Sequence, residues 1–106
     1  MASTKEGLIQ AQIMRYLKSL EGCWAVKTVV TASRGCPDVI VCYEGLFIAF
    51  EVKAADGRPS VLQLHNISEI EAAGGVASVV YSLEEVKDML KIIKALADKK
   101  ASLQGK

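Results

Sequence analysis

The chain has 106 residues and is short of the residue types that build several common kinds of site. It has one histidine, His65, and three cysteines, Cys23, Cys36 and Cys42, none of which forms a Cys-x-x-Cys pair. A zinc site made of thiolates and imidazoles is therefore disfavoured. An odd number of unpaired thiols is typical of a reduced protein, so we expect a cytoplasmic location.

Long apolar runs and a strong charge of either sign are also missing. No run approaches the roughly 20 apolar residues of a membrane helix, and we see no secretory signal. The net charge of +1 neither supports nor excludes nucleic acid, because a local basic patch can bind phosphates. No repeat, linker or low-complexity tract interrupts the chain, so we expect one globular domain over residues 1–106.

Apolar periodicity predicts a small α/β domain in the order helix, three strands, helix, strand, helix. Helical spacing marks residues 4–20, 60–73 and about 84–99, and strand-like runs occupy 24–31, 38–43, 46–53 and 76–81. We expect the basic C-terminal tail to fray. The aromatic residues Tyr16, Trp24 and Phe50 are predicted to lie in the core rather than to stack on bases.

Two of the predicted strands are joined by only two residues, at 44–45, the second of which is glycine. A connection of this kind is typical of a β-hairpin. If Tyr43 lies opposite Leu46, counting outward along both strands places Asp38 opposite Glu51. The sequence therefore predicts that two carboxyl groups face each other where the hairpin strands end.

The second hairpin strand should bury one face, formed by its residues 46, 48, 50 and 52. Its other face carries Phe47, Ala49, Glu51 and Lys53, so we expect it to be half-covered at most, with its charges at the C-terminal end.

Opposed carboxylates repel each other unless one is protonated, a cation lies between them or the strands diverge. A divalent cation with oxygen ligands is the arrangement that best relieves the repulsion between Asp38 and Glu51. Lys53 would then position or deprotonate a water and offset negative charge, as metal-assisted phosphodiester hydrolysis requires. The alternative is a structural ion pair of Lys53 with Asp38 or Glu51 and no metal.

These residues resemble a known nuclease signature. Pro37-Asp38, twelve further residues and then Glu51-Val52-Lys53 match the PD-(D/E)xK pattern on the expected hairpin. The flanking matches to the VRR-NUC domain, over about residues 6–81, are Gly35, Gly45, Gly57, Ser60-x-x-Gln63 and Gly74-Gly75. The chain is similar to the stand-alone form of that domain found in phages and bacteria.

This resemblance implies a restriction-endonuclease-like fold, with an αβββαβ core, a central mixed sheet flanked by helices and a C-terminal helix. It implies DNA cleavage with Mg²⁺ or Mn²⁺ by a homodimer that acts on Holliday junctions. By position, Asp38 and Glu51 would bind the metal together with the backbone carbonyl of Val52, and Lys53 would handle the attacking water. Gln63 would support Lys53 or the scissile phosphate.

The family's helical acid corresponds to Glu6, which would reach the metal through water. Glu6 and Gln63 also have a simpler interpretation, because a Ser followed three residues later by Glu or Gln can cap a helix. This pattern occurs at Ser3-x-x-Glu6, Ser60-x-x-Gln63 and Ser82-x-x-Glu85. Capping and a role in the site remain open for both residues, and they can coexist.

Other polar residues are weaker candidates. Arg34, Arg58 and Ser60 flank the predicted site and are candidates for contact with DNA phosphates, with plain solvent exposure as the alternative. His65 is predicted to lie on the surface. A basic strip on the last helix is typical of a solvated face, although it could touch the arms of branched DNA; it comprises Lys91, Lys94, Lys99 and Lys100.

The sequence favours a metal-dependent DNA endonuclease in a bacterial or phage-infected cell, with branched DNA as substrate. Two symmetric cuts in a four-way junction need two sites, which leads us to expect a two-fold homodimer. A flap, nicking or non-selective nuclease is an alternative within the enzyme class. Outside it, the alternatives are a non-catalytic DNA-binding module of the same fold and a small interaction domain with an incidental ion pair.

Overall fold

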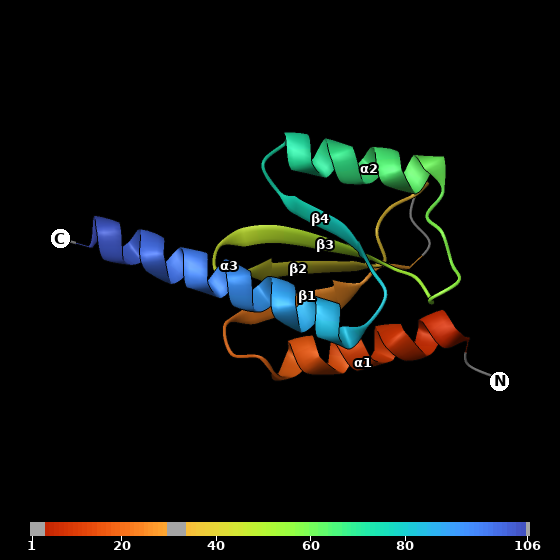
Figure 1. Cartoon of the computed structure of the whole chain (residues 1–106), viewed down its shortest axis with the longest axis horizontal. Helices are drawn as coiled ribbons and strands as arrows, with labels where there is room; N and C mark the ends of the chain where they lie inside the picture. Colours follow the sequence, from red (N-terminus) through yellow and green to blue (C-terminus); the bar gives the residue numbers. More distant parts are fainter. Residues whose placement is uncertain (1–3, 30–33, 106) are drawn as a thin grey trace.

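The computed structural model describes residues 4–29 and 34–105, which form one four-stranded sheet and three helices (Figure 1). The elements are α1 (Lys5–Ser19), β1 (Cys23–Lys27), β2 (Val39–Tyr43), β3 (Leu46–Val52), α2 (Val61–Ala72), β4 (Val76–Val80) and α3 (Leu83–Gln104). The sheet order is β1-β2-β3-β4, and only the β3–β4 pair is parallel. This arrangement confirms the predicted mixed α/β class. Within the described part of the chain, no helix is both long and apolar enough to cross a membrane.

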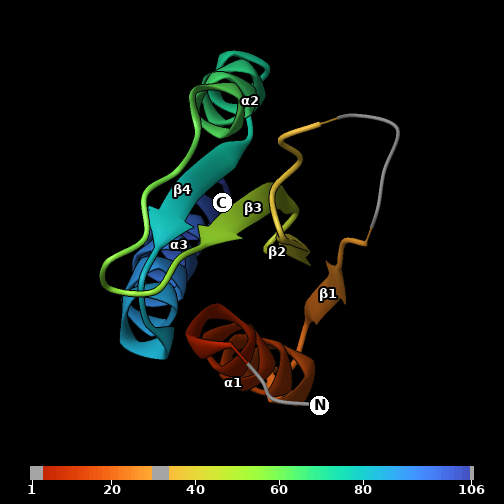
Figure 2. The same cartoon turned by 90° about the vertical axis from the view of Figure 1, so that its right-hand side faces the viewer.

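The helices lie on both faces of the sheet. α1 and α3 pack on one face, and α2 lies on the other, over β3 and β4 (Figure 2). The main core fills the space between the sheet and the α1–α3 pair. Its largest buried side chains include Ile13, Leu17, Ile48, Phe50 and Leu90.

The turn of the β2–β3 hairpin fixes the register that the sequence predicts. Glu44 and Gly45 both have positive φ, of 56° and 74°, as a two-residue type I′ turn requires. The ladder runs from the Tyr43–Leu46 pair to the pair formed by residues 39 and 50. One step further outward brings Asp38 opposite Glu51, so the predicted register is confirmed.

Two elements end where the sequence did not predict. β1 ends at Lys27, and Thr28 still contacts the segment that enters β2: its backbone N–H donates to the Asp38 carbonyl at 2.8 Å and its hydroxyl to the Pro37 carbonyl at 2.7 Å. Residues 30 and 31 of the predicted strand lie outside the described residues. α3 continues to Gln104, so the predicted fraying from about residue 99 is wrong; no Gly or Pro interrupts the segment before Gly105.

Two of the three predicted capping boxes also differ. Thr4 caps α1 and accepts a hydrogen bond from the backbone N–H of Gly7 at 2.9 Å, whereas Ser3 lies outside the described residues. Ser82 does cap α3, but the Glu85 carboxylate accepts from the backbone N–H of Tyr81 at 2.8 Å. The box at Ser60 is complete and is described with the site below.

Of the three aromatic residues predicted for the core, Trp24 is the exception. Phe50 is fully buried and Tyr16 packs against the core, but the Trp24 side chain is 59% exposed. Cys23 and Ala25 on either side of it face the core, so strand alternation directs Trp24 to the opposite face.

The loop before β2 is docked on α2 by a glycine. Gly35 has φ of +75°, and a Cβ built there would lie 2.8 Å from Nδ2 of Asn66 and 3.0 Å from the backbone carbon of Leu62. The same Nδ2 donates a hydrogen bond to the Arg34 carbonyl at 2.9 Å. A residue with a side chain would therefore push away the loop that leads to Asp38.

We predict that Gly35→Ala lowers the free energy of unfolding by more than Gly22→Ala does. Gly22 has nearly the same φ, +76°, but no described heavy atom lies within 4 Å of a Cβ built there. Both variants bear the backbone strain of about 1–2 kcal/mol, and only Gly35→Ala adds overpacking of roughly 1–3 kcal/mol. Urea denaturation measures both values. Equal losses would show that the loop is not docked as described.

Candidate active site

The residues that the sequence singled out meet at one end of the sheet. Glu51 is the penultimate residue of β3, and Asp38 directly precedes β2. Gln63 lies in the first turn of α2. The first turns of α1 and α2 lie at this same end of the molecule (Figure 1). The site is therefore formed where a hairpin ends and two helices begin.

Glu51 is buried, with only 2% of its surface exposed. The prediction that this face of β3 is half-covered at most holds for Phe47, which is 46% exposed, but is wrong for Glu51 and Ala49. The reason is that α2 packs over β3 and β4 on this side (Figure 2). A carboxyl group thus lies in a place that water reaches poorly.

Asp38 is fixed against the end of β3. Its Oδ2 accepts a hydrogen bond of 2.7 Å from the backbone N–H of Val52, just beyond the last pair of the ladder. Burial, followed by the charge of Asp38 and a hydrogen bond with it, raises the pKa of Glu51 from 4.5 to about 7. Burial and the neighbouring Asp38 thus favour the protonated form of Glu51.

Lys53 lies beside the buried carboxyl group. Its Nζ is 3.5 Å from Oε2 of Glu51, and its side chain is 14% exposed. Its backbone N–H donates to the Val80 carbonyl at 3.0 Å, which ties this residue to β4. Lys53 lowers the pKa of Glu51, but by less than burial and Asp38 raise it. The ion pair that the sequence offered as an alternative is present, and it belongs to the same cluster as Asp38.

Gln63 caps α2 and contacts the site at the same time. Its Oε1 accepts from the backbone N–H of Ser60 at 2.8 Å, and its own backbone N–H donates to the Ser60 hydroxyl at 3.1 Å. Its Nε2 donates to Oε2 of Glu51 at 2.9 Å. The sequence suggested Lys53 or a phosphate as the partner of Gln63, and the contact with Glu51 was not predicted. Because the Gln63 amide has an acceptor oxygen and a donor nitrogen, it can cap the helix and contact Glu51 at the same time. This property of the residue type could have predicted the contact.

Glu6 lies near the site but outside the carboxylate pair. A Cβ built on Gly57 would be 3.4 Å from Oε2 of Glu6, so this carboxylate lies against the loop between β3 and α2. It lines a hollow together with Lys5, Ala54 and Asp56. Among the described residues no three His, Cys, Asp or Glu side chains are grouped closely enough to bind a metal ion. A contact of Glu6 with a metal through water stays a prediction.

The donor set at this end of the sheet fits a hard divalent cation. Asp38 and Glu51 offer carboxylate oxygens, and the backbone carbonyl of Val52 follows directly in the chain. Mg²⁺ is typically bound by one or two carboxylates and keeps several waters. The raised pKa of Glu51 means that its negative charge is disfavoured in the metal-free chain. A cation bound here would stabilise the charged carboxylate in place of a proton.

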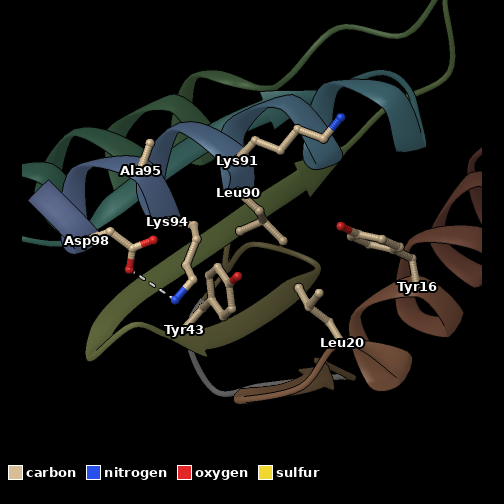
Figure 3. Close-up of a pocket in the computed structure, with 8 residues that line it drawn as sticks. All are labelled: Tyr16, Leu20, Tyr43, Leu90, Lys91, Lys94, Ala95 and Asp98. Carbon is tan, nitrogen blue, oxygen red and sulfur yellow. Dashed lines mark ion pairs between the residues drawn. The ribbon is translucent and has the colours of Figure 1, made fainter.

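The basic residues considered for contact with DNA lie in two regions of the molecule. Arg34 and Arg58 are exposed in the loops that flank the site, and His65 is exposed on α2, as predicted. Lys94 instead pairs with Glu44 and Asp98, each at 3.1 Å, beside a hollow between α1, the hairpin and α3 (Figure 3). Glu44 belongs to the turn at the opposite end of β3 from Glu51, so the lysine strip of α3 is remote from the carboxylates.

The pKa of Glu51 predicts how stability depends on pH without divalent metal. Because the folded value of about 7 exceeds the unfolded value of 4.5, the contribution of this group is fully present below pH 4.5 and is lost as the pH rises through 7. The free energy of unfolding should fall by up to about 3 kcal/mol over this range. Urea titrations should show this fall in the wild type and a nearly flat profile in Glu51→Gln. Parallel profiles for the two proteins would contradict the assignment.

The comparisons with known proteins agree with this geometry. No family model matches the sequence, and no curated protein matches it either. Among solved structures, one described as "VRR_NUC domain" has a TM-score of 0.72 and 26% identity, over 84% of this chain and 97% of that chain. Another, "VRR_NUC domain protein", has a TM-score of 0.66 over 90% and 89% of the two chains, and at 16% identity it supports the fold alone.

The prediction of a restriction-endonuclease-like fold is thus confirmed. The chain is thus similar to solved VRR_NUC domains, and its Asp38–Glu51–Lys53 cluster is consistent with the PD-(D/E)xK superfamily.

Proposed function

We propose that the chain is a Mg²⁺- or Mn²⁺-dependent DNA endonuclease that hydrolyses phosphodiester bonds, selects branched DNA such as a four-way junction and acts as a homodimer. The observation that carries this proposal is the buried Glu51, which lies 3.5 Å from Nζ of Lys53 and whose pKa is raised by burial and by Asp38. Burial of the Glu51 carboxyl group beside a second acid is costly, and such perturbed groups are typical of functional sites that bind a cation.

Asp38, Glu51 and the Val52 carbonyl would hold the metal. The bound ion supplies Lewis acidity toward a phosphoryl oxygen and lowers the pKa of a coordinated water. Glu51 would lose its proton on becoming a ligand of that ion. Gln63 donates to one oxygen of Glu51 and thereby orients the carboxylate, so Gln63 acts as a positioning residue.

Lys53 would provide a positive charge beside the reacting phosphate. Its ammonium group orients the attacking water and offsets the negative charge that develops as the phosphodiester is cleaved. Its low exposure strengthens both effects, because charges interact more strongly where water is excluded.

The DNA backbone would bind around this end of the molecule. The N-termini of α1 and α2 lie here, and helix N-termini favour phosphates (Figure 1). Arg34 and Arg58 are exposed in the adjoining loops, and the hydroxyl of Ser60 lies at the start of α2. Contacts of these kinds position a duplex without reading its bases, which favours recognition of DNA shape. Glu6 would act through water from the first turn of α1.

The homodimer follows from the substrate. A single chain has one such site, and resolving a four-way junction takes two symmetric cuts, which a two-fold dimer supplies. A flap, nicking or non-selective nuclease would use the same site and differ only in the DNA that it accepts. A non-catalytic binding module is disfavoured, since Asp38, Glu51, Lys53 and Gln63 are all present and in contact.

The test is cleavage of a labelled four-way junction, a flap and a linear duplex, each with Mg²⁺, Mn²⁺ or EDTA. We expect paired, symmetric cuts in the junction that need the metal. Lys53→Ala should reduce the cleavage rate by at least about a hundredfold while junction binding and folding stay near wild type. Lys94→Ala, which removes a lysine at the far end of β3, is the matched control and should cleave normally.

Each other outcome has a definite meaning. Equal cutting of all three substrates would keep the site and remove the junction selectivity. Binding of DNA without cleavage by the folded wild type would favour the binding module. Unchanged cleavage by Lys53→Ala would contradict the role given to that lysine.

A further inference from the structure

Asp38 lies just outside the sheet, where the strand ladder has ended. β2 begins at Val39, whose partner in β1 is Lys27, the last residue of that strand. One step further outward, Thr28 lies opposite Asp38. The position of Asp38, a metal ligand in the proposed function, therefore depends on the contacts that Thr28 makes beyond the end of β1.

Thr28 contacts the backbone of Pro37 and Asp38 with both its main chain and its side chain. Its backbone N–H donates to the Asp38 carbonyl at 2.8 Å. Its hydroxyl donates to the Pro37 carbonyl at 2.7 Å and lies 3.2 Å from the Asp38 carbonyl. Since a hydroxyl has a single hydrogen, the shorter contact with Pro37 is the main one. One residue at the end of β1 thus fixes two successive carbonyl groups.

The chemistry of Pro37 makes this hydroxyl important. Proline has no backbone N–H, so its carbonyl is the only group through which its main chain can form a hydrogen bond. Pro37 is buried, and a buried carbonyl needs a donor. The donor here is the side chain of Thr28, so a substitution can remove it without changing any backbone group.

Asp38 is held from the strands on both sides of β2. Thr28, after β1, fixes its backbone, and the backbone N–H of Val52, in β3, donates to its Oδ2 at 2.7 Å. These contacts together determine where the Asp38 carboxylate lies relative to Glu51. A metal site accepts ligand distances only within about 0.2 Å of their usual values, so a small shift of the Asp38 backbone would weaken binding.

We propose that Thr28 is a positioning residue of the metal site, and that its hydroxyl, through the carbonyls of Pro37 and Asp38, sets the place of the Asp38 carboxylate for a divalent cation. The assignment rests on the proposed function, because it needs Asp38 to be a metal ligand. The Thr28 hydroxyl contacts carbonyl oxygens and not the carboxylate, so it acts only through the backbone. Groups that orient a metal ligand in this way contribute strongly to metal affinity.

Two substitutions separate the hydroxyl from the shape of the side chain. Thr28→Val keeps the β-branch and the backbone N–H but has no hydroxyl, whereas Thr28→Ser keeps the hydroxyl. The full chain is titrated with Mn²⁺ by calorimetry in the absence of DNA. We expect Thr28→Val to raise the dissociation constant for Mn²⁺ by about 10–100-fold, and Thr28→Ser to stay close to the wild type. Junction cleavage by Thr28→Val should be lost at low Mn²⁺ concentration and recover when Mn²⁺ is raised.

Ser19→Ala is the matched control. The Ser19 hydroxyl also donates to a backbone carbonyl at 2.7 Å, that of Tyr16, but it does so at the C-terminal end of α1, away from the site (Figure 1). Its removal should leave the dissociation constant for Mn²⁺ unchanged. If Thr28→Val is too unstable in urea denaturation to be titrated, Thr28→Cys takes its place. A thiol is a weaker donor than a hydroxyl, so this variant should bind Mn²⁺ more weakly than Thr28→Ser.

Equal Mn²⁺ binding by the wild type and Thr28→Val would overturn the proposal alone, even if the variant unfolds more easily, because the hydroxyl would then serve only stability. Equal losses in Thr28→Val and Thr28→Ser would also overturn it, since the hydroxyl would not be the cause. A wild type that binds Mn²⁺ more tightly than Thr28→Val but cuts no DNA would support the role of Thr28 and contradict the nuclease. A wild type that binds no Mn²⁺ would contradict both.

Discussion

Glu51 is buried beside Asp38, and a buried carboxyl group next to a second acid is stable only when a proton, a cation or hydrogen-bond donors compensate the charge. Here the Val52 N–H donates to Asp38 and the Gln63 amide to Glu51, and the raised pKa of Glu51 favours its protonated form. Lys53 adds a positive charge without cancelling the effect of burial. We propose that this cluster exchanges a proton for a metal ion near neutral pH.

The surrounding fold serves to keep these groups together. The two-residue turn at 44–45 sets the register that opposes the acids, although it lies at the other end of the hairpin. Gly35 lets the loop before Asp38 dock on α2. The capping box of α2 orients Gln63, so one side chain connects the start of the helix to the buried carboxyl group. Three local features, each fixed by backbone geometry, therefore preorganise the site.

The hairpin, its register and the meeting of Asp38 with Glu51 could be predicted from the sequence, because a short turn and strand alternation determine them locally. The burial of Glu51 could not, since it depends on where α2 packs, and β3 alone reads as half-covered. The exposure of Trp24 could not be predicted either. An aromatic residue in a strand is usually buried, but no described helix covers this face of β1 and β2. The cap of α1 is Thr4 and not the predicted Ser3. Two adjacent hydroxyl residues can both cap a helix, so the sequence pattern alone does not choose between them.

The central claim, that a divalent cation replaces the proton of Glu51, is tested most directly by calorimetric titration with Mn²⁺ in buffers of different ionisation enthalpy. Below the Glu51 pKa of about 7, binding should release about one proton per ion, and well above it almost none. Glu51→Gln should bind Mn²⁺ much more weakly and release no proton. Proton release that does not depend on pH, or equal binding by Glu51→Gln, would contradict the account.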